Sequence, residues 1–275
     1  MARATPFFLS VGNGRRFGLL HRAAAESRQA GAILYVHPLA EEMNKARRVA
    51  AVQAGALAKA GWTVLLLDLF GCGDSEGDFR DAGWKQWLAD VRAAREWLRA
   101  ETGMAPVLWG LRAGALLAAN AAREMHPAPD LVLWQPVFSG KQLLQQFLRL
   151  RVAGQLTGSS AGDRVGTEHL RAQLGRGEVL EVAGYEVSRD LASGMEASEL
   201  VPPSEPIRIE LLEVSVSEET GLSPAATQRL DRWRTAGHRV NGSSVHGLPF
   251  WQTQEIAECP LLIDATLRAI GMLRR

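Results

Sequence analysis

Continuous apolar runs alternate along the chain with stretches whose apolar side chains recur at helical spacing. Four runs are typical of parallel strands covered on both faces, and they lie within residues 31–39, 63–79, 106–109 and 130–137. The stretches with helical spacing follow the first three runs, at residues 44–62, 84–103 and 115–126. This alternation predicts the α/β class, with a mostly parallel sheet and helices on both of its faces.

Local signals set the expected ends of single elements. Asn44 and Gly61 are expected to cap and to end the first helix. Two apolar runs around Gly12-Asn13-Gly14 predict a hairpin within residues 6–23. The C-terminal part continues the alternation with a strand, a helix, a strand with its loop, and a helix, expected at residues 206–214, 223–237, 238–247 and 258–275.

Residues 139–204 interrupt this rhythm. They read as a helix over 140–156, a loop over 158–169 and a hairpin around Gly184. We therefore predict a core at 1–138 and 205–275 with a lid inserted at 139–204. The apolar side chains of the lid helix are Leu143, Leu144, Phe147, Leu148 and Leu150. We favour core packing as their role. Binding of an acyl chain and formation of a homodimer are the alternatives.

A tight turn is expected between the run at 106–109 and the helix that follows. The turn reads Gly110-Leu111-Arg112-Ala113-Gly114, with small residues on both flanks, as a chain that doubles back beside neighbouring strands requires. This strand–turn–helix resembles the nucleophile elbow of α/β-hydrolases, which carries G-x-S-x-G. Arg112 stands where that motif has its serine.

The acid and the histidine of such a site follow the nucleophile in chain order. Glu219 follows a predicted strand, with Glu218 as its rival, and His246 follows the last predicted strand. The predicted catalytic set is therefore Arg112, Glu219 and His246. Cys72, in a glycine-rich loop, is a weaker candidate for a displaced nucleophile.

A guanidinium stays protonated and cannot attack a carbonyl, so Arg112 excludes the usual acyl-enzyme at this position. It can instead bind a carboxylate or phosphate at a helix N-terminus. The alternative is an internal ion pair, and the candidate partners are Glu41, Glu42, Glu218 and Glu219.

A second group of residues is expected around a bound ligand. The N–H groups of Leu39 and Ala113 match the two oxyanion donors of the fold. His37 and Glu41, on either side of Leu39, complete the predicted ligand-binding set. For His37 and the proline after it, a turn that merely ends a strand is the competing interpretation.

Composition excludes several classes of protein. The 275 residues carry a net charge of +1, and no basic run is interleaved with aromatic residues, so nucleic-acid binding is not expected. Two distant cysteines and six histidines without ligand spacing predict no disulfide framework, no metal and no cofactor. No run approaches about 18 apolar residues, and the N-terminus does not resemble a signal peptide. We expect a reduced, soluble, cytoplasmic protein.

Three stretches carry a closer resemblance, "HPLAEEMNKARR" (37–48), "WGLRAG" (109–114) and "LPFWQTQEIAECPLLIDAT" (248–266). Together they are similar to the exosortase A system-associated hydrolases of the second type. That resemblance implies a hydrolase-like fold in the bacterial cytoplasm, in a system for exopolysaccharide production and PEP-CTERM protein sorting. It names no substrate.

Two functional hypotheses follow. The first is a hydrolase or acyl-transfer relative that acts on a small acylated or anionic molecule, with His246 as base, Glu219 as its orienting acid and Arg112 as substrate anchor. The second is a catalytically inactive protein that binds a ligand or serves as a scaffold.

Overall fold

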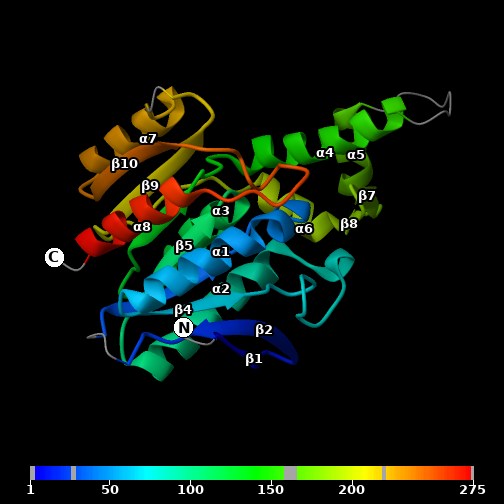
Figure 1. Ribbon diagram of the computed structural model, residues 1–275. Coiled ribbons are helices and arrows are strands. Elements are labelled where there is room, and N and C mark those ends of the chain that lie inside the picture. The colour runs from blue at the N-terminus through cyan, green and yellow to red at the C-terminus, as the bar shows by residue number, and fades with distance from the viewer. Residues whose placement is uncertain (1–3, 26–28, 158–165, 219–220, 274–275) are drawn as a thin grey trace.

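One sheet of eight strands organises the chain, in the order β1–β2–β4–β3–β5–β6–β9–β10 (Figure 1). The strands are β1 Ala4–Val11, β2 Gly14–His21, β3 Gly31–Val36, β4 Trp62–Leu67, β5 Val107–Leu111, β6 Leu131–Trp134, β9 Arg208–Ser215 and β10 Arg239–His246. From β4 to β10 all neighbours are parallel, and the hairpin β1–β2 joins β4 in antiparallel register. The computed structural model describes residues 4–25, 29–157, 166–218 and 221–273.

Helices cover both faces of this sheet. Helices α1 and α8 lie on one face, and α2, α3 and α7 lie on the other. Their bounds are α1 Glu41–Lys59, α2 Trp84–Thr102, α3 Ala113–Ala122, α7 Pro224–Thr235 and α8 Pro260–Met272, with a short 3-10 helix at Phe79–Asp81. The predicted fold class, a mostly parallel sheet between two helical layers, is confirmed.

The alternation of side chains along each strand divides the core into two layers. In β3, Ile33 and Tyr35 enter the layer beneath α1 and α8, whereas Leu34 and Val36 enter the layer beneath α2 and α3. Every residue of β3 is buried, which explains why its sequence is continuously apolar.

The start of α1 differs from the prediction. The helix begins at Glu41, and Asn44 lies inside its first turn, where its Nδ2 donates to the Tyr185 hydroxyl at 2.9 Å. Ala40 takes the position before the helix with φ 51° and makes no side-chain cap. The backbone turn at Ala40 thus starts the helix without the capping side chain that the sequence pattern suggested.

The described residues between β6 and β9 form α4 Gly140–Thr157, α5 Thr167–Gly175, β7 Leu180–Val182, β8 Tyr185–Val187 and α6 Arg189–Glu196. The hairpin β7–β8 around Gly184 confirms the predicted one, whereas α5 and α6 were not predicted. Of the predicted loop at 158–169, residues 158–165 lie outside the described residues, and the prediction is wrong at 167–169, which belong to α5. Helices α4 and α5 extend to one side of the sheet (Figure 1), and the division into core and lid stays a prediction.

The Ser188 hydroxyl caps α6 and ties it to the rest of the molecule. The Ser188 hydroxyl accepts from the N–H of Leu191 at 3.1 Å, which caps α6, and donates to the carbonyl of Ala82 at 2.7 Å. Gly194 of α6 lies against Trp84 of α2, where a Cβ would stand 2.4 Å from the Trp84 Cβ. Helix α6 is therefore packed against α2.

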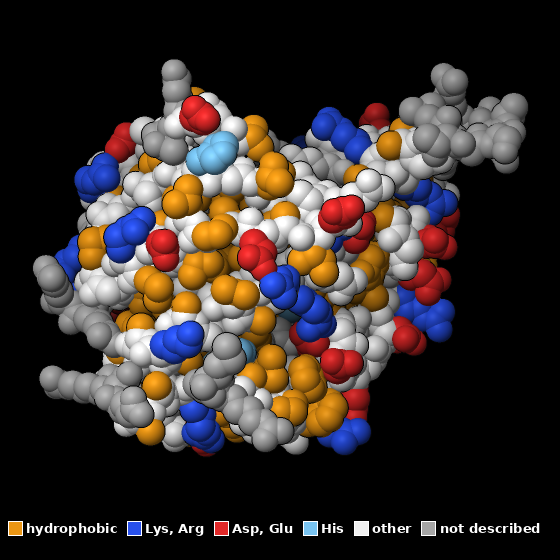
Figure 2. All heavy atoms as spheres, viewed as in Figure 1, with side chains coloured by type: hydrophobic (Ala, Val, Ile, Leu, Met, Phe, Trp, Pro, Cys, Tyr) orange, Lys and Arg blue, Asp and Glu red, His pale blue; other side chains and the backbone are white. Residues whose placement is uncertain are grey.

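The face of the molecule that carries α1 and α8 has interspersed charges. Acidic and basic side chains alternate with apolar ones on this face (Figure 2), so that no field of one sign covers it. None of the helices in the described part of the chain is long and apolar enough to cross a bilayer.

Candidate functional site

Arg112 stands at the tip of the turn between β5 and α3. Its φ of 55° and ψ of −116° lie in a region that residues with a side chain rarely adopt. A Cβ on Gly110 would stand 2.5 Å from the Ala115 N, and one on Gly114 would stand 2.1 Å from the Val36 O. Both contacts are with backbone, so the glycines that the sequence indicated for a tight turn are required by the structure.

A second turn with nearly the same conformation lies beside the first. Ala40 has φ 51° and ψ −124°, and it leads into α1. Gly114 touches the carbonyls of Val36 and His37, so the two turns are held together through backbone. Helices α1 and α3 both start here without a side-chain cap, and their N-terminal partial positive charges converge on one region.

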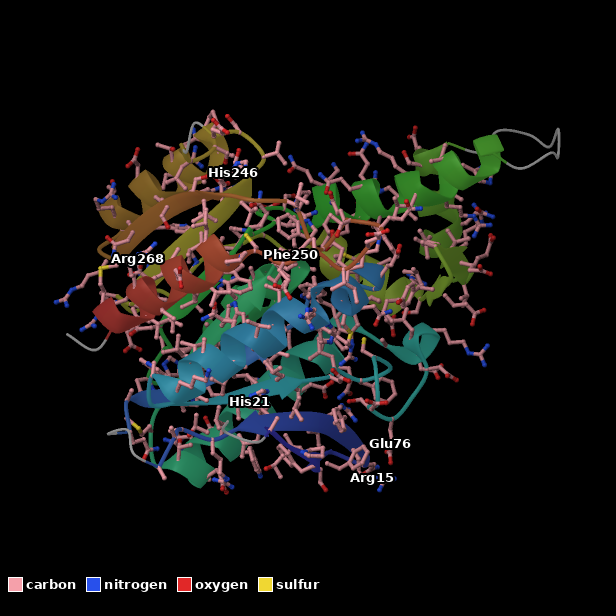
Figure 3. The ribbon with its side chains drawn as sticks, viewed as in Figure 1. Arg15, His21, Glu76, His246, Phe250 and Arg268 are labelled. Atoms are coloured by element: carbon pink, nitrogen blue, oxygen red, sulfur yellow. The ribbon has the colours of Figure 1, made fainter. Side chains whose placement is uncertain are left out.

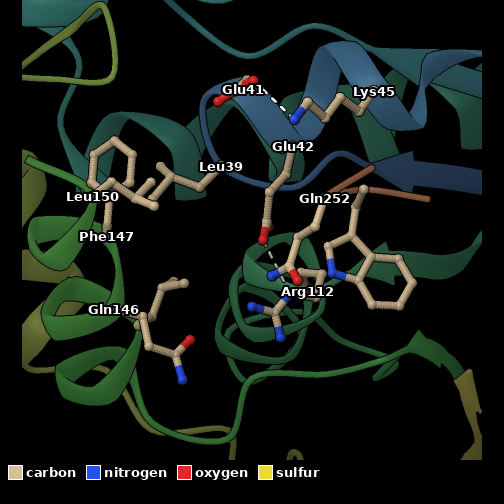
Figure 4. A pocket seen from close by; sticks show the side chains of 11 residues that line it. Leu39, Glu41, Glu42, Lys45, Arg112, Gln146, Phe147, Leu150 and Gln252 are labelled. Atoms are coloured by element: carbon tan, nitrogen blue, oxygen red, sulfur yellow. Dashed lines mark hydrogen bonds and ion pairs between the residues drawn. The ribbon is translucent and has the colours of Figure 1, made fainter. Parts of the chain in front are cut away.

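A pocket of about 400 Å³ opens at this region (Figure 4). It is formed by the turn before α1, the turn at Arg112, the helix α4 and the loop after β10. Its lining residues are Leu39, Glu41, Glu42, Lys45, Arg112, Leu143, Gln146, Phe147, Leu150, Trp251 and Gln252.

Arg112 is only partly neutralised inside this pocket. Its Nε lies 3.3 Å from Oε1 of Glu42, and the two side chains are 14% and 19% exposed. Its Cζ lies 6.0 Å from the centre of the Trp251 ring. Within the described residues, Nη1 and Nη2 of Arg112 make no hydrogen bond. The internal ion pair that the sequence left open therefore exists, but its hydrogen bond uses one of three nitrogens.

Glu42 is the half-buried acid of this pair. Burial raises the pKa of its carboxyl, Arg112 and Gln252 act in the opposite direction, and Glu41 raises it further. The Oε2 atom is buried and accepts no hydrogen bond from the described residues. Glu42 thus holds its negative charge less readily than an exposed glutamate.

The two predicted oxyanion donors flank the pocket. Leu39 lines it, and Ala113 is the buried first residue of α3. In the described part of the chain, neither N–H donates to an acceptor. The Leu39 carbonyl accepts from the N–H of Glu42 at 3.2 Å, which fixes the turn that presents the Leu39 N–H.

His37 and Glu41 take different places. The Nε2 of buried His37 accepts from the N–H of Leu69 at 3.2 Å, and its Nδ1 lies 2.7 Å from the carbonyl of Pro38. Burial lowers the pKa of His37, and the ring is absent from the pocket lining. Glu41 lies in the pocket, 2.9 Å from Nζ of Lys45.

His246 is the last residue of β10 and is exposed. Its Nδ1 lies 3.3 Å from the carbonyl of Ser217, in the loop after β9. That loop continues through exposed Glu218 to Glu219, which lies outside the described residues. Figure 3 shows His246 at the end of β10, with Phe250 nearer the middle of the molecule. The structure thus brings His246 to the loop of the predicted acid, while the lining of the Arg112 pocket does not include it.

The alternative nucleophile at Cys72 has an unfavourable environment. The side chain is buried, and burial raises the pKa of the thiol, with Asp68 and Asp90 raising it further. A thiol rather than a thiolate is the expected form, and the thiolate is the nucleophile. These facts argue against catalysis by Cys72.

Sequence reasoning did not identify Lys45, Trp251 and Gln252 as pocket residues. Lys45 lies four residues after Glu41 on the same helix face, and that spacing was available as a signal. Trp251 and Gln252 follow the predicted histidine in an aromatic loop, but no motif links that loop to the turn at Arg112.

Residues 27–175 match the family of serine aminopeptidases, S33 (Hydrolase_4). The chain belongs to this family. No curated protein matches the sequence. In the described residues, no three side chains form a group that could hold a metal ion.

Solved structures with the same fold are distant in sequence. A thermostable carboxyl esterase from Bacillus coagulans, in complex with glycerol, is 14% identical with a TM-score of 0.64, covering 100% of both chains. Est1E from Butyrivibrio proteoclasticus, with ferulic acid bound, is 13% identical with a TM-score of 0.63, covering 96% of this chain and 99% of its own. XC6422 from Xanthomonas campestris, a serine hydrolase without a lid, is 16% identical with a TM-score of 0.59, covering 99% and 95%. These similarities establish the α/β-hydrolase fold.

Proposed function

We propose that this protein binds a small anionic or acylated molecule in the pocket at Arg112 and forms no acyl-enzyme with it. One observation carries the proposal. Arg112 holds the strained turn at which α/β-hydrolases place their nucleophile, and its Nη1 and Nη2 make no hydrogen bond within the described residues. A permanent cation in that place cannot attack a carbonyl but can hold a carboxylate or phosphate through two parallel hydrogen bonds.

The composition of the pocket supports a binding role. Among its lining residues there is no serine, threonine, cysteine or histidine in the described part of the chain. Acyl transfer through a covalent intermediate needs a nucleophile with a base beside it. The α/β-hydrolase fold is therefore proposed to serve here as a ligand-binding scaffold.

The biological setting is proposed from the resemblance to the exosortase A system-associated hydrolases. The three stretches that carry this resemblance, 37–48, 109–114 and 248–266, supply residues to one pocket, namely Leu39, Arg112 and Trp251. We propose a role in the cytoplasm of a bacterium that produces exopolysaccharide and sorts PEP-CTERM proteins. The shared stretches would then preserve a shared ligand site.

A second function is favoured by one other set of observations. The N–H groups of Leu39 and Ala113 are free of acceptors within the described residues, and His246 contacts the loop that leads to Glu219. In this alternative, His246 removes a proton from water, Glu219 orients the imidazole, and the water attacks an acyl group held by Arg112. The leaving group departs with the proton carried by His246.

Hydrolysis assays separate the two functions. We expect the wild-type protein and Arg112→Ser both to be inert toward p-nitrophenyl esters and an acyl thioester, because the described lining of the pocket offers no histidine to activate a serine. Wild-type hydrolysis that is lost in His246→Ala would overturn the binding proposal in favour of the second function.

Anion binding is tested directly with butyrate by ligand-detected NMR. Arg112→Gln should abolish the signal. The matched control is Arg92→Gln, because Arg92 also pairs with a glutamate, Glu124, but lies on α2 outside the pocket. Equal binding by wild type and Arg112→Gln would contradict the proposal.

A further inference from the structure

The pocket has two chemically different walls. Leu143, Phe147 and Leu150 of α4 form an apolar wall beside Gln146 of the same helix. Arg112 with Gln252 forms part of a polar wall (Figure 4). A ligand that satisfies both walls must itself have a polar end and an apolar body.

The apolar wall is a single helical stripe. Its residues recur at i, i+4 and i+7, which places them on one face of α4. The stripe begins in the core at Leu143 and Phe147, which are buried, and ends at Leu150, which is 50% exposed. A second stripe on the same helix, Leu144 and Leu148, is fully buried and packs in the core. Stability of the fold accounts for the second stripe but does not account for an exposed leucine at the rim of a pocket.

The charges at the polar wall select the charge of the ligand. Lys45 is paired with Glu41 at 2.9 Å, and Nε of Arg112 is paired with Glu42 at 3.3 Å. Two cations and two acids thus balance. Within the described residues, Nη1 and Nη2 of Arg112 are charged donors without a hydrogen bond, beside the neutral N–H groups of Leu39 and Ala113. One negative charge can be bound there. A second negative charge would add to the repulsion from the carboxylate of Glu42, because like charges repel.

We infer that the ligand is an aliphatic monocarboxylate, with its carboxylate on Nη1 and Nη2 of Arg112 and its chain along the Leu143–Phe147–Leu150 stripe. This inference rests on the proposed binding function. The stripe spans about 10 Å of helix axis, at about 1.5 Å per residue. With carbon–carbon bonds of about 1.5 Å in zigzag, a chain of roughly eight carbons covers that length.

Calorimetric titration with four probes tests the inference: butyrate, decanoate, decyl phosphate and decanol, all below the concentration of micelle formation. We expect decanoate to bind at least tenfold more tightly than butyrate, because the longer chain buries more apolar surface. Decanoate should also bind more tightly than decyl phosphate and decanol.

Variants separate the two ends of the site. Arg112→Gln should weaken butyrate and decanoate alike, and Arg112→Lys, which keeps the charge and loses the planar fork, should weaken both to a smaller extent. Leu150→Gln should weaken decanoate several-fold and leave butyrate unchanged. Leu261→Gln is the matched control, since Leu261 is 51% exposed, close to the 50% of Leu150, and lies on α8 outside the pocket.

Each outcome has a distinct meaning. If neither carboxylate binds the wild-type protein, the proposed binding function itself fails. If butyrate binds through Arg112 but decanoate binds no more tightly, or Leu150→Gln has no effect, the chain site is overturned and the anion site stands. If decyl phosphate binds more tightly than decanoate, the argument from charge balance is overturned.

Discussion

Two residues with side chains, Ala40 and Arg112, share a backbone conformation that usually costs about 1 to 3 kcal/mol. Such strain persists where the surrounding structure leaves no alternative, and here Gly114 is wedged against the backbone of β3. The two turns aim the first residues of α1 and α3 at one pocket. The Gly110–Gly114 sequence predicted the turn at Arg112, whereas an alanine at position 40 gives no signal for a turn.

The sequence limited the candidate ion-pair partners of Arg112 to four glutamates but could not decide among them. Glu41, Glu42, Glu218 and Glu219 were all candidates, and the structure selects Glu42. The choice depends on the unusual turn at Ala40, which starts α1 three residues before the predicted cap. A one-residue change in that start rotates the helix by about 100° and would present a different side chain.

Glu42 should compete with a bound carboxylate for Arg112. Burial raises the pKa of the Glu42 carboxyl, so lowering the pH protonates it earlier than an exposed glutamate and removes the competing charge. Arg112 and Gln252 face this carboxyl from other segments, and Glu41 lies beside it on α1, where it is paired with Lys45.

We therefore expect the affinity for butyrate to rise as the pH falls from about 7.5 to about 5.5, a range above the usual carboxylic acid pKa of about 4 to 5. Glu42→Gln should bind butyrate several-fold more tightly at pH 7 and lose most of this pH dependence. Calorimetric titration at several pH values measures both effects. An unchanged pH profile in Glu42→Gln would show that Glu42 does not compete.

At the scale of elements, the sequence predicted those whose pattern repeats over several turns or strands. The alternation of apolar runs and amphipathic stretches is a consequence of burial on both faces of a sheet, and it located β3, β4, β5 and their helices. Helix α6 was not predicted because it has only eight residues, with Ser193 and Gly194 in its interior. Such residues have low helix propensity. Packing against Trp84 makes this segment helical.

The turn between β5 and α3 should tolerate no side chain at Gly114. The Cβ of Gly114→Ala would stand 2.1 Å from the Val36 carbonyl oxygen, and backbone cannot move aside as a flexible side chain can. We expect the free energy of unfolding to fall by about 3 kcal/mol, the upper part of the usual range for overpacking. Urea denaturation followed by circular dichroism measures this loss.

Gly55→Ala is the control for this prediction. Gly55 lies within α1, and a Cβ there would have no neighbour within 4 Å. Alanine favours the helix over glycine, so this variant should be more stable than wild type by about 0.5 to 1 kcal/mol. If Gly114→Ala is as stable as wild type, the turn does not require glycine.

At the scale of the molecule, the pocket joins segments that are far apart in the sequence. Leu39, Arg112, Phe147 and Trp251 meet there, and only the segment around Arg112 carries a motif with local meaning. The order of a predicted acid and histidine along the chain does not show whether their side chains reach the pocket. His246 illustrates this, because it ends a strand as predicted in order, yet it is exposed and contacts the loop after β9 rather than the pocket.

The two cysteines provide a probe of the whole fold. Cys72 and Cys259 are both buried and unbridged. Burial raises the pKa of both thiols, and Asp68 and Asp90 raise that of Cys72 further. The thiolate of an accessible cysteine attacks the disulfide of such a reagent and releases half of it as a free thiolate. Both side chains should therefore be protected until the protein opens.

We expect dithionitrobenzoate to label neither cysteine of the native protein within minutes, and to label both once urea unfolds the chain. Glutathione at the same pH serves as the freely reactive reference. Cys259→Ala leaves Cys72 as the single thiol, and Cys72→Ala leaves Cys259, so each site is followed separately. The labelling rate should rise along the same urea transition as the loss of circular dichroism, because exposure of either thiol requires loss of the packed layers on its side of the sheet. Rapid labelling of native Cys259→Ala would instead show an accessible thiolate at Cys72 and restore it as a candidate nucleophile.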